Sequence, residues 1–266
     1  MLLRDLDYAR PGSVEDAVEL LAAREDARAL AGGQSLVNVM KTRVAAPELV
    51  VDLNAIDTLR GIASDGGALE IGAMTTYSAI IDSPEVAAAR PILAAVARTI
   101  ADVQVRNRGT IGGNVCSNDP TNPFPPLLAA LGASFTIRGA GGERTVSADE
   151  FFEGVYLTAV QPGELLMSVR IPAKGDARDG WAAMTLGKDG TGIVNVAATV
   201  SGGSARIAIG CVAAIPVVVS ASADETAIRD AVASADLDPP ADVHASADYR
   251  RHLAGVLAAR AVQEAR

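Results

Sequence analysis

Aromatic residues make up only 3% of this 266-residue sequence, and cysteine and histidine occur twice each. The shortage of aromatics argues against an aromatic-lined pocket and favours short strands and helices built from small residues. Two cysteines, Cys116 and Cys211, cannot alone supply a four-cysteine zinc or iron–sulfur site. A disulfide between them stays open at this stage, although so few cysteines are typical of a cytosolic protein.

Long hydrophobic runs are also missing. The segment Met1–Gly12 carries four charged side chains and has no apolar stretch of signal-peptide length. The longest apolar run, Ile207–Val219, is interrupted by Gly210 and Pro216 and is too short to span a bilayer. We therefore expect a cytoplasmic protein with no transmembrane segment, and leave a peripheral position at the inner membrane face open.

Positive charge is scarce as well. The chain has 23 Lys and Arg against 32 Asp and Glu, which gives a net charge of −9. Because affinity for nucleic acid comes mainly from neutralising phosphates, we expect no nucleic-acid partner. Hydrophobic residues nevertheless make up 49% of the chain, so one large or two smaller domains can bury a sizeable core.

Two common nucleotide-binding fingerprints are absent. The sequence contains neither G-x-G-x-x-G nor G-x-x-x-x-G-K-[ST]. A Rossmann dinucleotide site and a P-loop are therefore excluded, and a dinucleotide would need a different architecture.

Hydrophobic periodicity and turn residues predict a mixed α/β region up to about residue 173 and a smaller α+β domain after it. Residues 173–180 are charged and aperiodic, and predict a linker. Residues 109–115, with three glycines, predict extended or turn structure, and residues 139–142 a hairpin turn. Helices are predicted at 14–24 (with Ser13 as N-cap), 84–101, 125–131, 222–235 and 246–265; strands are predicted at 27–31 (buried), 49–53, 69–73, 134–138, 165–171, 181–186, 193–201 and 205–212, the last three antiparallel.

Two glycine-rich segments are the strongest indication of a ligand-binding site in this sequence. The first, 31–36 (AGGQSL), follows a predicted strand, and the second, 106–114 (RNRGTIGGN), follows a predicted helix. A glycine pair lets the backbone approach a ligand and turns successive N–H groups toward it, as an anion such as a pyrophosphate requires. Ser35 and Thr110 add hydroxyl groups. The alternative is that both are ordinary Gly-Gly turns.

Together the two segments resemble a known pair. Ala31–Ser35 and Thr110–Asn114 resemble the two FAD-pyrophosphate motifs of the flavin subunit of molybdenum hydroxylases. This is the medium chain of carbon monoxide dehydrogenase, and it also occurs in xanthine, aldehyde and N-heterocycle dehydrogenases. The resemblance covers nearly the whole chain. It includes three further stretches: Val51–Leu53, Gln104–Asn107, and Gly163–Leu166 followed by Ile171–Pro172.

The resemblance implies a vanillyl-alcohol-oxidase-type (PCMH) FAD-binding domain of two subdomains. This domain would span residues 1–175, with subdomains at about 1–55 and 56–175. A small α+β C-terminal domain, with a three-stranded antiparallel sheet and helices, would span residues 176–266.

The resemblance also implies which residues bind FAD, noncovalently because no histidine precedes the glycine motifs. Both histidines, His244 and His252, are expected at the surface. Leu166 would pack near the adenine or the flavin, Asp119 or Asn122 would make a polar contact, and Lys188 would lie near the pyrimidine edge of the flavin. The cofactor-binding set is Ala31, Gly32, Gly33, Gln34, Ser35, Leu36, Thr110, Ile111, Gly112, Gly113, Asn114, Asp119, Asn122, Leu166 and Lys188.

The sequence departs from the family pattern at two places. Pro123 stands where many relatives have an aspartate, so Asp119 or Asn122 would have to replace that contact. In the C-terminal domain, Met184 and Gly192 or Ile193 stand where many relatives have a cation and an aromatic residue. The face of the flavin ring would therefore be more open.

The implied function is an electron-transfer subunit with no catalytic or metal-ligating residues of its own. It would take electrons from a small [2Fe–2S] subunit and pass them to an external acceptor, while a large subunit with the molybdenum cofactor oxidises the substrate. The expected assembly is an (αβγ)2 heterohexamer. Two alternatives are a self-contained flavin reductase or oxidase of the same superfold, and a binding module that has lost its flavin.

Overall fold

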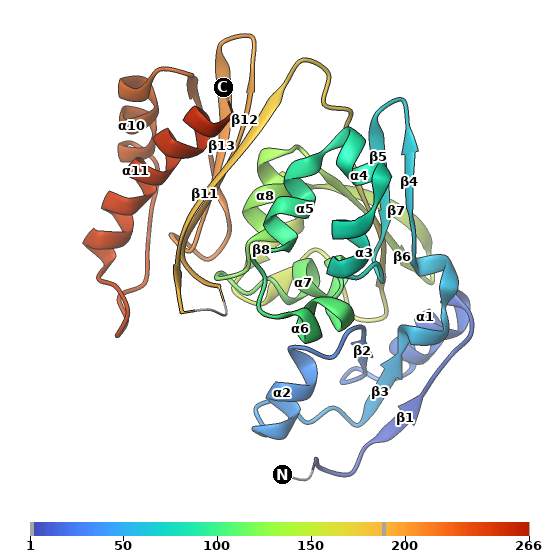
Figure 1. The fold of residues 1–266 in the computed structure, drawn as a ribbon. Coiled ribbons are helices and arrows are strands. Elements are labelled where there is room, and N and C mark those ends of the chain that lie inside the picture. Colours follow the sequence, from blue (N-terminus) through green and yellow to red (C-terminus); the bar gives the residue numbers. More distant parts are fainter. Residues whose placement is uncertain (1–2, 188–189, 266) are drawn as a thin grey trace.

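The computed structural model describes residues 3–187 and 190–265, which form three packed parts (Figure 1). The first part is a three-stranded parallel sheet of order β1-β3-β2, with helices beside it. Its elements are β1 (Asp7–Ala9), α1 (Val14–Ala23), β2 (Arg28–Leu30), α2 (Leu36–Lys41), β3 (Leu49–Asp52) and the 3-10 turns η1 (Leu53–Ala55) and η2 (Asp57–Leu59). As predicted, the Ser13 side chain caps α1. The strand predicted at 27–31 is present as β2, but the prediction that it is buried is wrong, because Arg28 and Ala29 are exposed.

The second part is a five-stranded antiparallel sheet of order β4-β5-β10-β6-β7, covered by short helices. The predicted hairpin turn at 139–142 joins β6 to β7. The elements are β4 (Ile62–Asp65), β5 (Ala68–Gly72), α3 (Tyr77–Asp82), α4 (Pro84–Ala89), α5 (Pro91–Ala97), α6 (Val103–Arg108), α7 (Ile111–Ser117), α8 (Phe124–Ala130), β6 (Ser134–Gly139), β7 (Gly142–Ser147), α9 (Ala148–Phe151), β8 (Phe152–Gly154), β9 (Leu157–Thr158) and β10 (Leu165–Ile171).

Two local predictions in this part are wrong. The single helix predicted at 84–101 is divided into α4 and α5 at Arg90, since a residue that precedes a proline disfavours the helical conformation. The extended segment predicted at 109–115 is instead largely helical, as α7. Its N-cap is Thr110, whose hydroxyl oxygen accepts a hydrogen bond from the Gly113 N–H at 3.0 Å. The glycines of this segment therefore sit inside a helical turn.

The third part is an antiparallel sheet of order β11-β12-β13-β14. This sheet was predicted to have three strands, and it has four in the described part of the chain. The additional strand, β14, begins inside the apolar run Ile207–Val219 and extends beyond it, so the hydrophobic pattern did not separate it. The predicted linker is also shorter, since β11 begins at Arg178. The elements are β11 (Arg178–Leu186), β12 (Thr191–Ser201), β13 (Ser204–Gly210), β14 (Val217–Ser222), α10 (Glu225–Ala233) and α11 (Ala247–Glu264).

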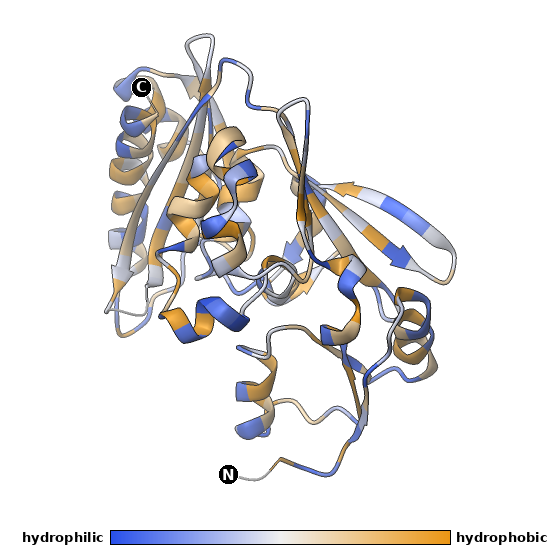
Figure 2. Ribbon diagram, turned by 45° about the vertical axis from the view of Figure 1, so that its right-hand side comes forward, coloured by the Kyte–Doolittle hydropathy of each residue, from blue (hydrophilic) through white to orange (hydrophobic). Residues whose placement is uncertain are grey.

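Helix α11 packs against β11 and β12, and its buried residues Leu253, Leu257 and Val262 belong to the hydrophobic cluster of this part. Figure 2 shows hydrophobic and hydrophilic residues alternating along the helix. Gly180 makes this contact possible. A β-carbon added there would overlap the carbonyl oxygen of Ala261 and lie 2.9 Å from the nitrogen of Ala265. Among the described residues, no helix is both long and apolar enough to cross a membrane.

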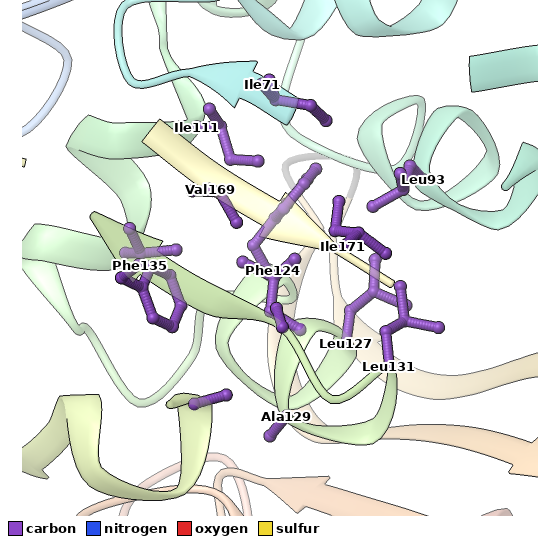
Figure 3. Packing of buried hydrophobic residues seen from close by; sticks show 14 of the residues in the cluster. Ile71, Leu93, Ile111, Phe124, Leu127, Ala129, Leu131, Phe135, Val169 and Ile171 are labelled. Atoms are coloured by element: carbon purple, nitrogen blue, oxygen red, sulfur yellow. The ribbon is translucent and has the colours of Figure 1, made fainter. Parts of the chain in front are cut away.

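The largest hydrophobic core lies between the five-stranded sheet and the short helices (Figure 3). Phe124 of α8 is fully buried there with Ile71 and Val169 of the sheet. Behind them the rings of Phe135 and Phe151 stack with centroids 3.9 Å apart. All four phenylalanines are buried in this core, whereas Tyr8, Tyr156 and Tyr249 are exposed.

A buried ion pair joins the second part to the third. The guanidinium of Arg90 donates to both carboxylate oxygens of Asp179, at 2.6 and 2.7 Å, and to the carbonyl oxygen of Pro172. Thr199 of β12 donates to the same carboxylate at 3.0 Å. Both charged side chains are almost completely buried. The break between α4 and α5 places Arg90 at this junction.

We predict that Arg90→Met lowers the free energy of unfolding by about 3–5 kcal/mol, because the Asp179 carboxylate would stay buried without its cation. Urea unfolding of the full chain measures this. Arg251→Met is the control, since Arg251 pairs with the exposed Asp248 and its loss should change stability little. Equal effects of the two substitutions would contradict the role given to the buried pair.

Candidate functional site

The structure brings the two glycine-rich segments together. The β2–α2 connection lies against the connection from α6 to α7, and Figure 1 shows these helices on facing sides of the first two parts. A β-carbon added at Gly32 would overlap the carbonyl oxygen of Arg108 and lie 2.9 Å from the Cα of Gly109. One added at Gly113 would lie 3.6 Å from the β-carbon of Ala31. Segments far apart in the sequence therefore form one site.

The first segment presents free backbone donors. Gly33 has a φ of +75°, which only glycine adopts readily. Among the described residues, no acceptor receives a hydrogen bond from the backbone N–H groups of Gly32, Gly33, Gln34 or Ser35. The Gln34 side chain instead donates to the carbonyl oxygen of Gly32 at 3.2 Å, which folds the segment on itself. Leu36 begins α2 directly afterwards. Consecutive free N–H groups of this kind suit an anion.

A polar network holds the first segment in place. Asn54 donates from its side chain to the carbonyl oxygen of Ala31 at 3.0 Å, and to Asp52 Oδ1 at 2.6 Å. Tyr8 donates to Asp52 Oδ2 at 2.6 Å. Burial alone would raise the pKa of Asp52, but the hydrogen bonds from Tyr8 and Asn54 outweigh it and hold the pKa below 3.8.

The second segment uses most of its own donors. The N–H of Ile111 bonds to the carbonyl oxygen of Thr75, and that of Gly112 to the carbonyl oxygen of Ala73, at 3.0 and 2.9 Å. The Gly113 N–H bonds to the Thr110 hydroxyl, as described above. The backbone N–H groups from Ile111 to Asn114 therefore already have acceptors, and the free donors belong to the first segment.

One acceptor in the second segment has no partner. The side-chain oxygen of Asn114 is buried and accepts no hydrogen bond among the described residues. Burial raises the pKa of the neighbouring Tyr77 phenol, and the side-chain amide of Asn114 lowers it only in part, so the proton of Tyr77 is retained. An orphaned buried amide oxygen costs about 1–3 kcal/mol, and a hydroxyl or N–H group of a bound ligand would remove that cost.

The loop after α7 carries the two predicted polar contacts. Asn122 donates to the backbone carbonyl oxygen of Asn114 at 3.3 Å, so it lies beside the second segment. Asp119 accepts hydrogen bonds from the Thr121 N–H and hydroxyl, and from Tyr156 at 3.2 Å. Asn122 thus contacts the second segment directly, and Asp119 lies three residues before it in the same loop.

The other predicted site residues, the cysteine of the second segment's helix and the histidines lie in different surroundings. Leu166 is buried in the main core and has no exposed face in this structure. Lys188 lies outside the described residues. Cys116 is free, and burial raises the pKa of its thiol to about 12, so it is not a reactive thiolate. The expectation of surface histidines is confirmed, since His244 and His252 are exposed.

Sequence reasoning missed the support of the site, namely Tyr8, Asn54 and Tyr77. The sequence did hold one signal, because Asp52 lies near the end of the strand predicted at 49–53 and Asn54 directly follows that strand. Short polar side chains at such a strand end commonly hold a neighbouring loop.

We predict that Asp52→Asn lowers the free energy of unfolding by about 1–3 kcal/mol at pH 7. The folded pKa of Asp52 lies below its ordinary 3.8, so the carboxylate stabilises the fold above that value. This contribution is lost as the pH falls below 3.8 through the folded pKa. Urea unfolding at pH 7 and pH 3 should therefore show a gap between wild type and variant that narrows in acid. A gap independent of pH, or one equally large for the exposed Asp7→Asn, would contradict this.

Comparison with known proteins finds two family models that together cover nearly all of the chain. Residues 4–174 match the family model described as "FAD binding domain in molybdopterin dehydrogenase", and residues 180–265 match "CO dehydrogenase flavoprotein C-terminal domain". The chain is 42% identical to the carbon monoxide dehydrogenase medium chain of Afipia carboxidovorans, over 100% of this chain and 98% of that protein. It is 34% identical to the nicotine 6-hydroxylase medium subunit of Paenarthrobacter nicotinovorans, over 100% and 99%.

A solved structure agrees with these matches. A chain of the Cu,Mo-CO dehydrogenase superposes with a TM-score of 0.93 at 41% identity, covering 100% of this chain and 99% of that one. The fold predicted from the two glycine motifs is thereby confirmed, apart from the number of strands in the C-terminal sheet. The chain belongs to the molybdopterin dehydrogenase FAD-binding family and carries the CO dehydrogenase flavoprotein C-terminal domain.

Proposed function

We propose that this chain is the FAD-carrying electron-transfer subunit of a multi-subunit molybdenum hydroxylase. The observation that carries the proposal is the contact at Gly32. It brings Gly32–Ser35, whose N–H groups are free, against the connection that leads into Thr110–Asn114, where a buried acceptor lacks a partner. This arrangement fits a dinucleotide, which offers both a diphosphate and hydroxyl groups.

Different residues of the site would hold different parts of FAD. The N–H groups of Gly32, Gly33, Gln34 and Ser35 would hold the diphosphate, flanked by Ala31 and Leu36. Thr110–Asn114 would form the opposite wall, with the Asn114 side-chain oxygen accepting a hydrogen bond from the cofactor. Asp119 and Asn122 would add polar contacts, Leu166 would support the site from the core, and Lys188 belongs to the same proposal.

Bound FAD supplies the redox chemistry that links an iron–sulfur donor to an external acceptor. The chain itself binds and orients the cofactor. The Asn54 side chain, which also donates to Asp52, donates to the Ala31 carbonyl oxygen, so this carbonyl already has a partner before the cofactor binds.

The partners follow from the names of the relatives. Both relatives above are called a medium chain or medium subunit, which implies a larger and a smaller chain in their enzymes. We propose a large subunit with the molybdenum cofactor, a small [2Fe–2S] subunit and an (αβγ)2 heterohexamer. Two cysteines in this chain are too few to ligate the clusters. Both thiols are free, which supports a cytoplasmic location.

The domain division at residue 175 is part of the proposal. The matched family ranges leave a gap between 174 and 180, and the residues after the gap have a hydrophobic cluster of their own. A further division at about residue 55 is supported by the separate three-stranded sheet of the first part.

Native purification tests the function. The visible spectrum is recorded, the chromophore is released with acid and identified, and co-purifying chains are sequenced. We expect FAD, iron–sulfur absorbance and two partner chains. FAD in an active protein without partners would favour a self-contained flavin reductase or oxidase. A colourless protein that takes up no added FAD would contradict the proposal.

We predict that Gly32→Ala lowers FAD retention at least about tenfold, because the new β-carbon forces the Arg108 carbonyl away and opens the site. Gly33→Val and Gly113→Val should act in the same direction, through the positive φ and the crowding of Thr110. Flavin bound per chain measures the effect. Gly141→Ala is the matched control, since nothing lies within 4 Å of its β-carbon. Wild-type flavin content in Gly32→Ala would overturn the placement.

A further inference from the structure

Backbone strain in this chain gathers around one short segment, the 118–122 loop that follows α7. Among the described residues, five non-glycine residues have positive φ: Arg43, Ala101, Asn118, Tyr156 and Cys211. Asn118 lies in the loop, and Tyr156 and Cys211 each hydrogen-bond to it. Strained residues persist only where their surroundings over-determine them, and they cluster at functional sites.

The C-terminal domain holds the loop by two backbone carbonyls. The thiol of Cys211 donates to the carbonyl oxygen of Pro120 at 3.1 Å. The side-chain amide of Asn195 donates to the carbonyl oxygen of Thr121 at 3.1 Å, and it lies 3.6 Å from the Cys211 sulfur. Asn195 is on β12, and Cys211 directly follows β13. Both residues are buried, so each carbonyl would lose a protected partner if its donor were removed.

The opposite side of the loop is held by the β8–β9 hairpin. The Asn118 side chain donates to the carbonyl oxygens of Gly154 and Leu157, at 2.6 and 3.1 Å. Tyr156 donates two hydrogen bonds to the loop, from its N–H to the Asn118 carbonyl oxygen and from its hydroxyl to Asp119. The loop is therefore fixed from both sides, and the positions of Asp119 and Asn122 are fixed with it.

Cysteine is an unexpected residue at position 211. Its φ of +67° would suit glycine, and the preceding residue is already Gly210. A side chain at this position is unfavourable for the backbone, and glycine could not replace the contacts of the sulfur with Pro120 and Asn195. Burial raises the pKa of the thiol to about 12, so the sulfur keeps the proton that it donates.

We propose that Asn195 and Cys211 are positioning residues, through which the C-terminal domain sets the 118–122 loop and holds Asp119 and Asn122 against bound FAD. This inference rests on the proposed FAD site. It makes the affinity for the cofactor depend on two side chains of a domain that need not touch the diphosphate. It also predicts that the two residues act together, since their side chains adjoin and they hold consecutive carbonyls.

The test separates positioning from simple stabilisation. The full-length chain is freed of flavin and titrated with FAD, following flavin fluorescence, and the thermal midpoint of each flavin-free variant is measured. The variants are Cys211→Gly, Cys211→Ser, Asn195→Ala and the double variant Cys211→Gly/Asn195→Ala. Val194→Ala is the matched control, because Val194 neighbours Asn195 on β12 but packs in the C-terminal hydrophobic cluster.

We expect Cys211→Gly to keep or raise the thermal midpoint, since glycine relieves the strained φ, and yet to raise the Kd for FAD about tenfold. Asn195→Ala should also raise the Kd about tenfold. Cys211→Ser keeps a donor and should stay within about threefold of wild type. The double variant should weaken binding by less than the product of the single effects, as coupled residues do. Val194→Ala should lower the midpoint and leave the Kd unchanged.

Three results would overturn the inference. A Kd within about twofold of wild type in both Cys211→Gly and Asn195→Ala would show that the loop does not need these donors. A Kd that rises in Val194→Ala as much as in Asn195→Ala would show a purely structural effect. A wild-type chain that binds no FAD would remove the proposed function itself, whereas the first two results leave that function standing.

Discussion

The backbone contact between Gly32 and the Arg108–Gly109 peptide is the constraint on which the site depends. It exists because Gly32 has no β-carbon, and any other residue would overlap the Arg108 carbonyl. Through it the parallel sheet of the first part meets the helices of the second part, at segments remote in the sequence. Neither segment alone encloses a ligand. Together they provide free N–H donors on one side and a rigid helical turn with an unpaired amide oxygen on the other.

The polar residues around this contact serve mainly to keep it in place. Tyr8, Asp52 and Asn54 secure the first segment from behind, and Thr110 caps the helix that carries the second. The Arg90–Asp179 pair ties the C-terminal domain to the second part, and the bonds from Asn195 and Cys211 tie it to the 118–122 loop. Each network is buried or half-buried, where a hydrogen bond is worth more than at the surface and an unmade one costs more. A cofactor that arrives at such a site meets groups that are already oriented.

The sequence predicted the motifs and most regular elements but not their surroundings. Strand 165–171 and helix 14–24 were predictable because their hydrophobic patterns are clear, and the paired glycine motifs led to the family. The 109–115 segment was misread because three glycines suggest a turn, whereas the Thr110 cap and tertiary bonds make it largely helical. The break at Arg90 could be read from Pro91, but its buried partner Asp179 could not. The positive φ at Cys211 and the hold on the 118–122 loop depend on contacts that no local pattern encodes.

An experimental structure of the full chain with FAD tests the central claim most directly. The account predicts that the diphosphate lies within hydrogen-bond distance of the N–H groups of Gly32–Ser35, on the side facing Thr110–Asn114. It also predicts that the Asn114 side-chain oxygen gains a donor from the cofactor. A diphosphate bound away from the two segments, with Gly32 still packed on Arg108, would contradict the account.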